Sequence, residues 1–208
     1  MSMSFMVFSC SECEYSDTSM VLWGIFNYQG SQGPVPVERQ LGWCHQCEGL
    51  APIEVLPSEG RIKIIEQREF PAFMGPVDKT VPLSESEKTK NMEWQRAWRE
   101  RELKDEYSRL SLLVDRESGP RCLSCGSTSI FYLPNDIDVQ GSWCDPAPPT
   151  AFGVAHPGCG GSLLVCHSEM RFQLEIPDRL FDMEGCQVSD ESCPVVEIPH
   201  QLDLFEEE

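Results

Sequence analysis

Four short turns with metal-ligand spacing constrain this chain more than any other feature. In chain order they are Cys10-x2-Cys13, Cys44-x2-Cys47, Cys122-x2-Cys125 and His156-x2-Cys159. Thirty residues separate the first turn from the second, and thirty separate the third from the fourth, so one offset of 112 residues relates all four ligand positions. We interpret this self-similarity as a duplicated module in which one cysteine has become a histidine.

A two-residue gap lets a tight turn present both side chains to one ion, and a second turn completes a tetrahedron. A left-handed backbone is favoured after the second ligand, where Gly126 and Gly160 stand in the second module and Glu14 and Glu48 in the first. We therefore predict one metal site in each module. The first would be formed by Cys10, Cys13, Cys44 and Cys47, and the second by Cys122, Cys125, His156 and Cys159.

This arrangement resembles the zinc-ribbon and rubredoxin-like families, and the resemblance covers the two modules but not the rest of the chain. It implies two structural Zn²⁺ ions, with iron as the alternative in the four-cysteine first site. The histidine of the second module suits zinc better. Because four protein ligands leave no open position for a reacting water, the resemblance implies no catalytic role.

The cysteine count and the N-terminus indicate a reducing compartment. Eleven cysteines, an odd number, argue against a closed disulfide framework. No charged leader precedes an apolar stretch, and the longest apolar run, 20–26, is too short to span a bilayer. We therefore expect a cytoplasmic protein. Cys144, Cys166, Cys186 and Cys193 lie outside the repeat and are predicted to be ordinary thiols, with Cys166-His167 as an alternative ligand pair.

The predicted fold class is α+β, with two small β-rich zinc ribbons joined by a strand and one long helix. The predicted segments are ribbon 1 over 1–60, a connector over 61–116, ribbon 2 over 117–183 and a disordered acidic tail over 184–208. Alternating or β-rich patterns predict strands near 5–8, 52–56, 61–67 and 170–176, and prolines predict a long loop over 134–150.

The long helix is predicted from residue 84 to about 115. Ser84 and Glu87 form a capping box at its start, and Gly119-Pro120 follows its end. One predicted apolar face carries Met92, Leu103, Tyr107, Leu110 and Val114. Trp94 and Trp98 fall on nearly the opposite face, so this helix either bridges the two ribbons or offers the tryptophans to a second subunit or partner.

The C-terminal tail carries a compact motif, Gln201-Leu202-Asp203-Leu204-Phe205. It resembles the peptide by which many bacterial proteins dock on the replicative sliding clamp. The resemblance implies that Gln201 hydrogen-bonds at the pocket rim, that Leu204 and Phe205 fill an apolar pocket, and that Leu202 supports them. The alternative is an ordinary apolar tail that folds back on a ribbon.

Charge and composition exclude several functions. The net charge is −18, and twelve of the sixteen Lys and Arg lie in 61–116, so broad nucleic-acid binding is not expected. No phosphate loop, nucleophile elbow or open metal site indicates an enzyme. The leading hypothesis is a non-enzymatic adaptor docked on the clamp. Alternatives are a nucleic-acid-binding ribbon protein using Trp23 or Trp143, and a rubredoxin-like redox protein.

Overall fold

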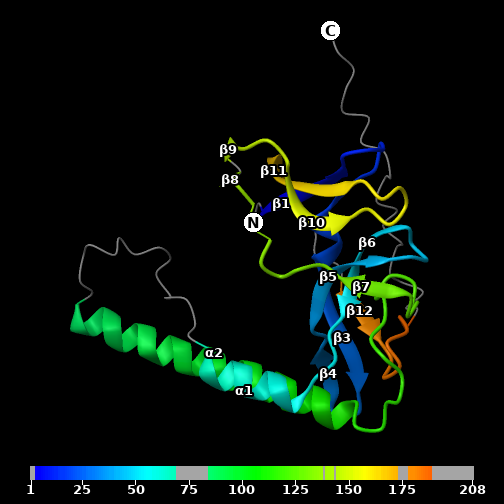
Figure 1. The fold of residues 1–208 in the computed structure, drawn as a ribbon. Helices are drawn as coiled ribbons and strands as arrows, with labels where there is room; N and C mark the ends of the chain where they lie inside the picture. Colours follow the sequence, from blue (N-terminus) through cyan, green and yellow to red (C-terminus); the bar gives the residue numbers. More distant parts are fainter. Residues whose placement is uncertain (1–2, 69–83, 138, 143, 173–177, 189–208) are drawn as a thin grey trace.

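The computed structural model describes residues 3–68, 84–137, 139–142, 144–172 and 178–188. The fold is mixed α+β and mostly β, as predicted (Figure 1). The strands of the N-terminal half are β1 Met3–Cys10, β2 Ser16–Thr18, β3 Ile25–Gly30, β4 Gly33–Pro36, β5 Arg39–Cys44 and β6 Gly49–Glu54, with a 3-10 turn, η1, at Ser19–Leu22. The helices are α1 Glu59–Gln67 and α2 Glu85–Leu112. The later strands are β7 Ile130–Tyr132, β8 Gly141–Ser142, β9 Asp145–Pro146, β10 Thr150–Ala155, β11 Ser162–Phe172 and β12 Asp178–Phe181.

Each larger sheet combines strands from both halves of the chain. The strand orders are β10-β11-β1-β2, β12-β3-β4 and β6-β5-β7, and β8 and β9 form a separate hairpin. The first strand β1 runs antiparallel to β11, with Cys10 opposite Leu163. The short β7 likewise pairs with β5, and β12 runs parallel to β3. The two predicted ribbons therefore do not close on themselves but are interleaved.

The apolar core likewise combines side chains from both halves of the chain. One buried cluster consists of Phe8, Leu41, Trp43, Leu50, Leu133 and Val165. Phe8 and Val165 come from the paired strands β1 and β11, whereas Trp43 and Leu50 come from the β5–β6 hairpin. Because the side chains of one half are covered by those of the other, the burial that stabilises each half depends on both.

The predicted strand over 61–67 is wrong, because these residues form α1. Ser58 caps this helix by accepting a hydrogen bond from the backbone N–H of Arg61, and Glu59 in the first turn favours the positive end of the helix dipole. The alternation of Ile62 and Ile64 suggested a strand, yet Ile64 is 63% exposed and only Ile65 is buried.

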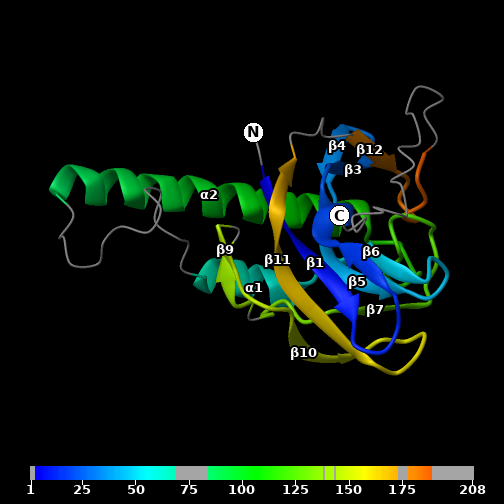
Figure 2. The ribbon, with the colours of Figure 1, turned by 90° about the horizontal axis from the view of Figure 1, so that it is seen from above.

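The long helix α2 confirms the predicted element within three residues at either end. Figures 1 and 2 show it as an arm that extends beyond the β-rich body, with α1 beside it. Its predicted apolar face is not the buried one, since Tyr107 and Val114 are 54% and 75% exposed. The buried face carries Glu106 and Arg109 instead. In the described part of the chain, no helix has the length and apolar composition needed to span a bilayer.

Buried charges are held in two networks. Glu106 accepts hydrogen bonds from Arg109, at 2.6 Å, and from the backbone N–H of Ser58, at 3.1 Å, which joins α2 to the start of α1. Glu54 at the end of β6 is fully buried and pairs with Arg116 through two bonds of 2.6 and 2.7 Å. Tyr28 also donates a hydrogen bond to Glu54. Removing one partner of such a pair leaves an uncompensated buried charge.

We expect Arg116→Met to lower the free energy of unfolding by about 3–5 kcal/mol, because Glu54 would stay buried without its cation. Glu100→Gln provides the control. It removes the partner of Arg96 in an exposed pair, and should change stability by less than about 0.5 kcal/mol. Urea unfolding followed by circular dichroism, with saturating Zn²⁺, measures both. Equal effects would show that the Glu54–Arg116 pair is not a major contributor.

Candidate metal centres

The eight predicted ligands come together in two groups of four, but the predicted pairing of the turns is wrong. The outer site contains Cys10, Cys13, His156 and Cys159, and the inner site contains Cys44, Cys47, Cys122 and Cys125. Within each group, one ligand atom per residue lies within 4.8 Å of the others. The first turn therefore meets the fourth, and the second meets the third. Each half of the chain contributes one turn to each site.

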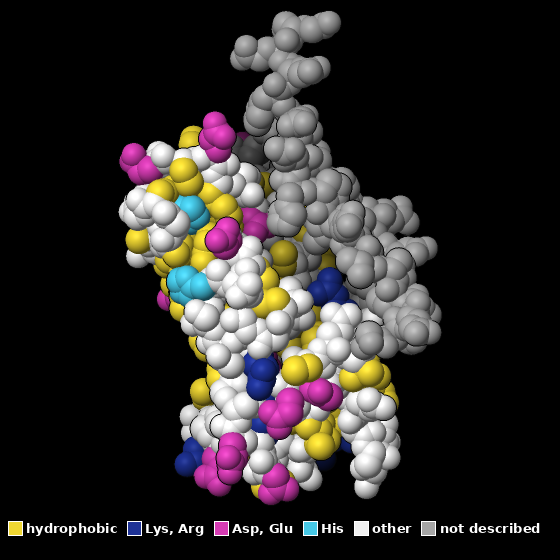
Figure 3. Space-filling view, turned by 90° about the vertical axis from the view of Figure 1, so that its right-hand side faces the viewer, with side chains coloured by type: hydrophobic (Ala, Val, Ile, Leu, Met, Phe, Trp, Pro, Cys, Tyr) yellow, Lys and Arg dark blue, Asp and Glu magenta, His cyan; other side chains and the backbone are white. Residues whose placement is uncertain are grey.

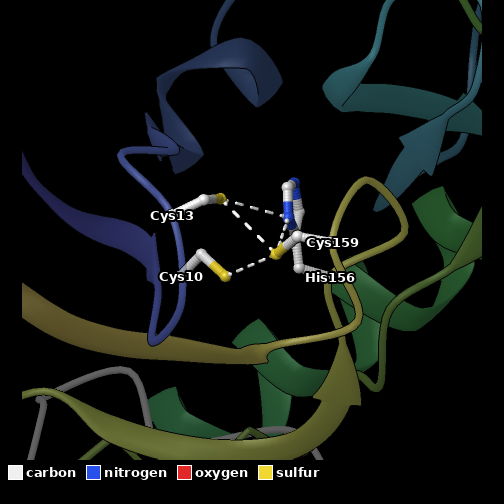
Figure 4. Close-up of side chains that lie close together, drawn as sticks. All are labelled: Cys10, Cys13, His156 and Cys159. Atoms are coloured by element: carbon white, nitrogen blue, oxygen red, sulfur yellow. Dashed lines mark hydrogen bonds between the residues drawn. The ribbon is translucent and has the colours of Figure 1, made fainter.

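The outer site has the dimensions of a tetrahedral ligand set (Figure 4). The Sγ atoms of Cys10 and Cys159 are 3.3 Å apart, and those of Cys13 and Cys159 are 3.6 Å apart. His156 turns its Nδ1 atom toward the sulfurs, 3.2 Å from Cys159 and 3.5 Å from Cys13. Two thiolates on one zinc ion are about 3.8 Å apart for Zn–S bonds of about 2.3 Å. The spacing thus fits a single ion.

The inner site is similar in size and more buried. The Sγ atom of Cys44 is 3.5 Å from that of Cys125, and that of Cys47 is 3.8 Å from that of Cys122. Cys44 and Cys122 are fully buried, whereas Cys47 and Cys125 are exposed. Each turn therefore supplies one buried and one exposed thiol.

Both sites are constructed in the same way, from a hairpin tip of one half and a turn of the other. The outer site uses the β10–β11 turn, and Ser11 N–H donates to the carbonyl of Ser162 at the start of β11. The inner site uses the β5–β6 turn, and Leu123 N–H donates to the carbonyl of Pro52 in β6. Strand pairing and these hydrogen bonds thus place the two turns of each site side by side.

A left-handed backbone follows the second ligand at three of the four turns, but not at Glu14 after the first. Gly126 and Gly160 have φ of +75° and +78°, and Glu48 is the one described non-glycine residue with positive φ, at 54°. A further glycine, Gly161, was missed by the sequence reading. A Cβ atom there would lie 2.8 Å from the Cys10 sulfur, so this position allows the two turns to approach. The Gly160-Gly161 doublet was the available signal.

Aromatic rings hold the histidine ligand in place. His156 is 7% exposed, stacks on Tyr15 at 4.6 Å between ring centroids, and meets the edge of Trp43 at 5.1 Å. Tyr15 itself is fixed by a 3.1 Å hydrogen bond to Asp17. These contacts orient the imidazole so that Nδ1 is the ligand atom, a role for Tyr15 and Trp43 that spacing alone did not indicate.

Burial affects the protonation of one inner thiol, that of Cys122, most clearly in the metal-free protein, whereas at Cys44 burial is outweighed by hydrogen bonds that lower the pKa. Burial raises the pKa of Cys122 to about 12, although the backbone N–H groups of Ser124 and Cys125 act in the opposite direction. This thiol is therefore protonated at neutral pH until an ion displaces its proton. The inner site offers four sulfurs, and the outer site offers three sulfurs and one imidazole. Both donor sets fit a thiophilic ion such as zinc. A tetrahedral ion bound there would have all four coordination positions filled by protein side chains.

The remaining predicted residues lie outside both clusters. Cys166 and His167 sit in β11 opposite Val7 and Met6, so they do not replace either ligand pair. Trp94 and Trp98 pack on each other with centroids 5.4 Å apart. Trp23 meets the edge of the Phe5 ring. Trp143, Cys193 and the motif Gln201, Leu202, Asp203, Leu204 and Phe205 lie outside the described residues.

Comparisons with protein-family models, with curated proteins and with solved structures find no match for this chain.

Metal stoichiometry of two reciprocal variants tests the pairing. We expect two equivalents in the wild type. The variant Cys10→Ser, Cys13→Ser, His156→Ala, Cys159→Ser should retain one, because the inner site stays complete. The variant Cys10→Ser, Cys13→Ser, Cys44→Ser, Cys47→Ser should retain none, since it damages both sites. Elemental analysis of the purified, dialysed proteins gives the counts. The reverse result, none and then one, would restore pairing within each predicted module.

Metal affinity of the inner site should rise steeply with pH. A thiol such as Cys122, with its pKa raised to about 12, must lose a proton on binding, so protons compete with the ion at every pH below that value. We expect the logarithm of the apparent affinity to increase by at least about one for each pH unit between pH 6 and 8. Competition with a chromogenic chelator, using the variant that lacks the outer site, measures the slope. A flat profile would mean that the thiols are already ionised.

Proposed function

We propose that this chain is a non-enzymatic zinc-binding adaptor that docks on the bacterial sliding clamp through its C-terminal tail. The observation that carries the non-enzymatic part is the completeness of both ligand clusters, each with four protein side chains within 4.8 Å. A catalytic zinc site usually has three protein ligands and an open position. Four protein ligands per site, drawn from both halves of the chain, are typical of ions that stabilise a fold.

Zinc is favoured over iron by the donor chemistry and by the repeat. The outer site includes an imidazole, which suits zinc, and the inner site is built by the same type of turns. The rubredoxin-like alternative now applies to the inner site, because that is the all-cysteine set. A red protein containing iron after aerobic purification would support that alternative, and a colourless protein with two equivalents of zinc would support the adaptor.

The tail motif supports the docking part of the proposal. Gln201 to Phe205 follows a segment of acidic and proline residues, and the whole of 184–208 carries a charge of −8. A short peptide motif can enter an apolar pocket of a partner without any change in the folded part of its own chain. In this binding mode Leu204 and Phe205 are the anchors and Gln201 is the polar contact.

A nucleic-acid-binding ribbon is less favoured. The chain carries a net charge of −18, and acidic side chains are spread over the face seen in Figure 3. Its candidate stacking residue Trp23 is packed against Phe5. Trp98 in α2 is 43% exposed. Contact of the Trp94–Trp98 pair with a second subunit or another protein stays a prediction.

We expect Leu204→Ala combined with Phe205→Ala to reduce clamp affinity by at least about a hundredfold, because both apolar anchors are lost. Val196→Ala combined with Ile198→Ala is the control, since it removes similar apolar volume from the same tail outside the motif, and it should bind as the wild type does. Surface plasmon resonance with purified bacterial clamp measures both, and metal content checks that the body is intact. No wild-type binding, or equal binding by both variants, would refute docking.

A further inference from the structure

A fifth thiol lies beside the inner metal site. Cys125 and Cys186 line the same shallow depression of about 230 Å³. Its lining consists of the turn residues Leu123, Ser124, Cys125 and Gly126 together with Cys186 and Gln187. Both thiols are exposed to solvent, whereas Cys44 and Cys122 of the same site are fully buried. The depression therefore gives a small oxidant access to one ligand and one non-ligand thiol together.

The turn that carries Cys186 has a defined conformation. The backbone N–H of Asp182 donates to the carbonyl of Cys186 at 2.9 Å, and the N–H of Cys186 donates to the Asp182 carboxylate at 2.8 Å. Gly185 occupies the left-handed region, with φ of +77°, which reverses the chain. These bonds close a loop of five residues immediately after β12, so Cys186 is presented at a fixed place.

Contacts with the body hold this turn against the third metal-binding turn. Phe181 is fully buried and stacks on Phe26 with centroids 5.8 Å apart. Glu184 accepts a 2.9 Å hydrogen bond from Ser118 and lies 3.8 Å from Arg121, the residue directly before the ligand Cys122. Contacts on both sides of Cys186 thus keep its turn next to the residues that precede the third metal-binding turn.

We propose that Cys186 is the resolving thiol of a hydroperoxide-sensitive switch at the inner metal site. This inference rests on the proposed metal-binding function. In the first step the Cys125 thiolate attacks one oxygen of the peroxide, the O–O bond breaks, and water (or an alcohol) leaves after taking up a proton. Cys125 becomes a sulfenic acid and leaves the ligand set.

In the second step Cys186 attacks the sulfur of the Cys125 sulfenic acid. An S–S bond forms, the S–O bond breaks, and the hydroxide leaves as water with the proton of the Cys186 thiol. The two sulfurs together supply the two electrons that reduce the peroxide. The site is left with three ligands and so binds the ion less tightly, which favours its release to a competing chelator, and a thiol reductant reverses the change. The bond also fixes the third turn to the segment after β12.

The switch is tested with zinc-loaded protein treated with excess hydrogen peroxide, since sulfinic acid consumes two peroxide molecules per thiol. We expect a Cys125–Cys186 disulfide, mapped by tandem mass spectrometry without reduction, to form together with release of zinc to a chromogenic chelator. In Cys186→Ser, Cys125 should advance to sulfinic acid at least about fivefold more than in the wild type, because the thiol proposed to capture the sulfenic acid is gone. Cys144→Ser, which removes an exposed thiol in another hairpin, should behave as the wild type does.

The outcomes separate this inference from the function on which it rests. Absence of zinc before oxidation would overturn the metal-binding proposal itself. With two equivalents bound, a dominant bond from Cys125 to another thiol of its own cluster (Cys44, at 3.5 Å, Cys47 or Cys122), or from Cys186 to Cys193, would overturn the role of Cys186. Equal sulfinic acid at Cys125 in the wild type and in Cys186→Ser would overturn it as well.

Discussion

The exchange of turns between the two halves of the chain is the constraint on which the rest of the structure depends, since each candidate metal site takes one turn from each half. The outer site ties β1 to the β10–β11 turn, and the inner site ties the β5–β6 turn to residues 122–125. The two closures are nested, because the second and third turns lie between the first and fourth. A chain closed in this way cannot separate into two independent ribbons, and its core is shared for the same reason.

The ligands could be predicted from the sequence, but their partners could not. Four turns can be paired in three ways, and the offset of 112 residues shows only which turns are equivalent. Pairing within each module and exchange between modules both give every site one first-type and one second-type turn. The choice is made by long-range strand pairing, β1 with β11 and β6 with residues 121–123, which local spacing does not encode.

Helix prediction succeeded where local chemistry decides and failed where packing decides. The capping signals and helix-favouring composition predicted α2 nearly to its bounds. Its buried face could not be found from apolar periodicity, because Glu106 and Arg109 are buried there by pairing with each other and with groups of α1 and β4. In α1, the Ser58 cap outweighs the alternation of Ile62 and Ile64, and most of the short helix stays solvent-exposed.

The two sites are built from the same kinds of turn, but they differ in burial and in the groups that surround them. The inner site has two fully buried sulfurs and stands next to the buried Glu54–Arg116 pair, since Arg121, one residue before Cys122, donates its backbone N–H to Glu54. Loss of its ion would therefore disturb a charge that needs its partner. The outer site has its sulfurs nearer to solvent and relies on the aromatic packing of His156. Oxidation of a thiol at the inner site would therefore reach further into the fold than the same change at the outer site.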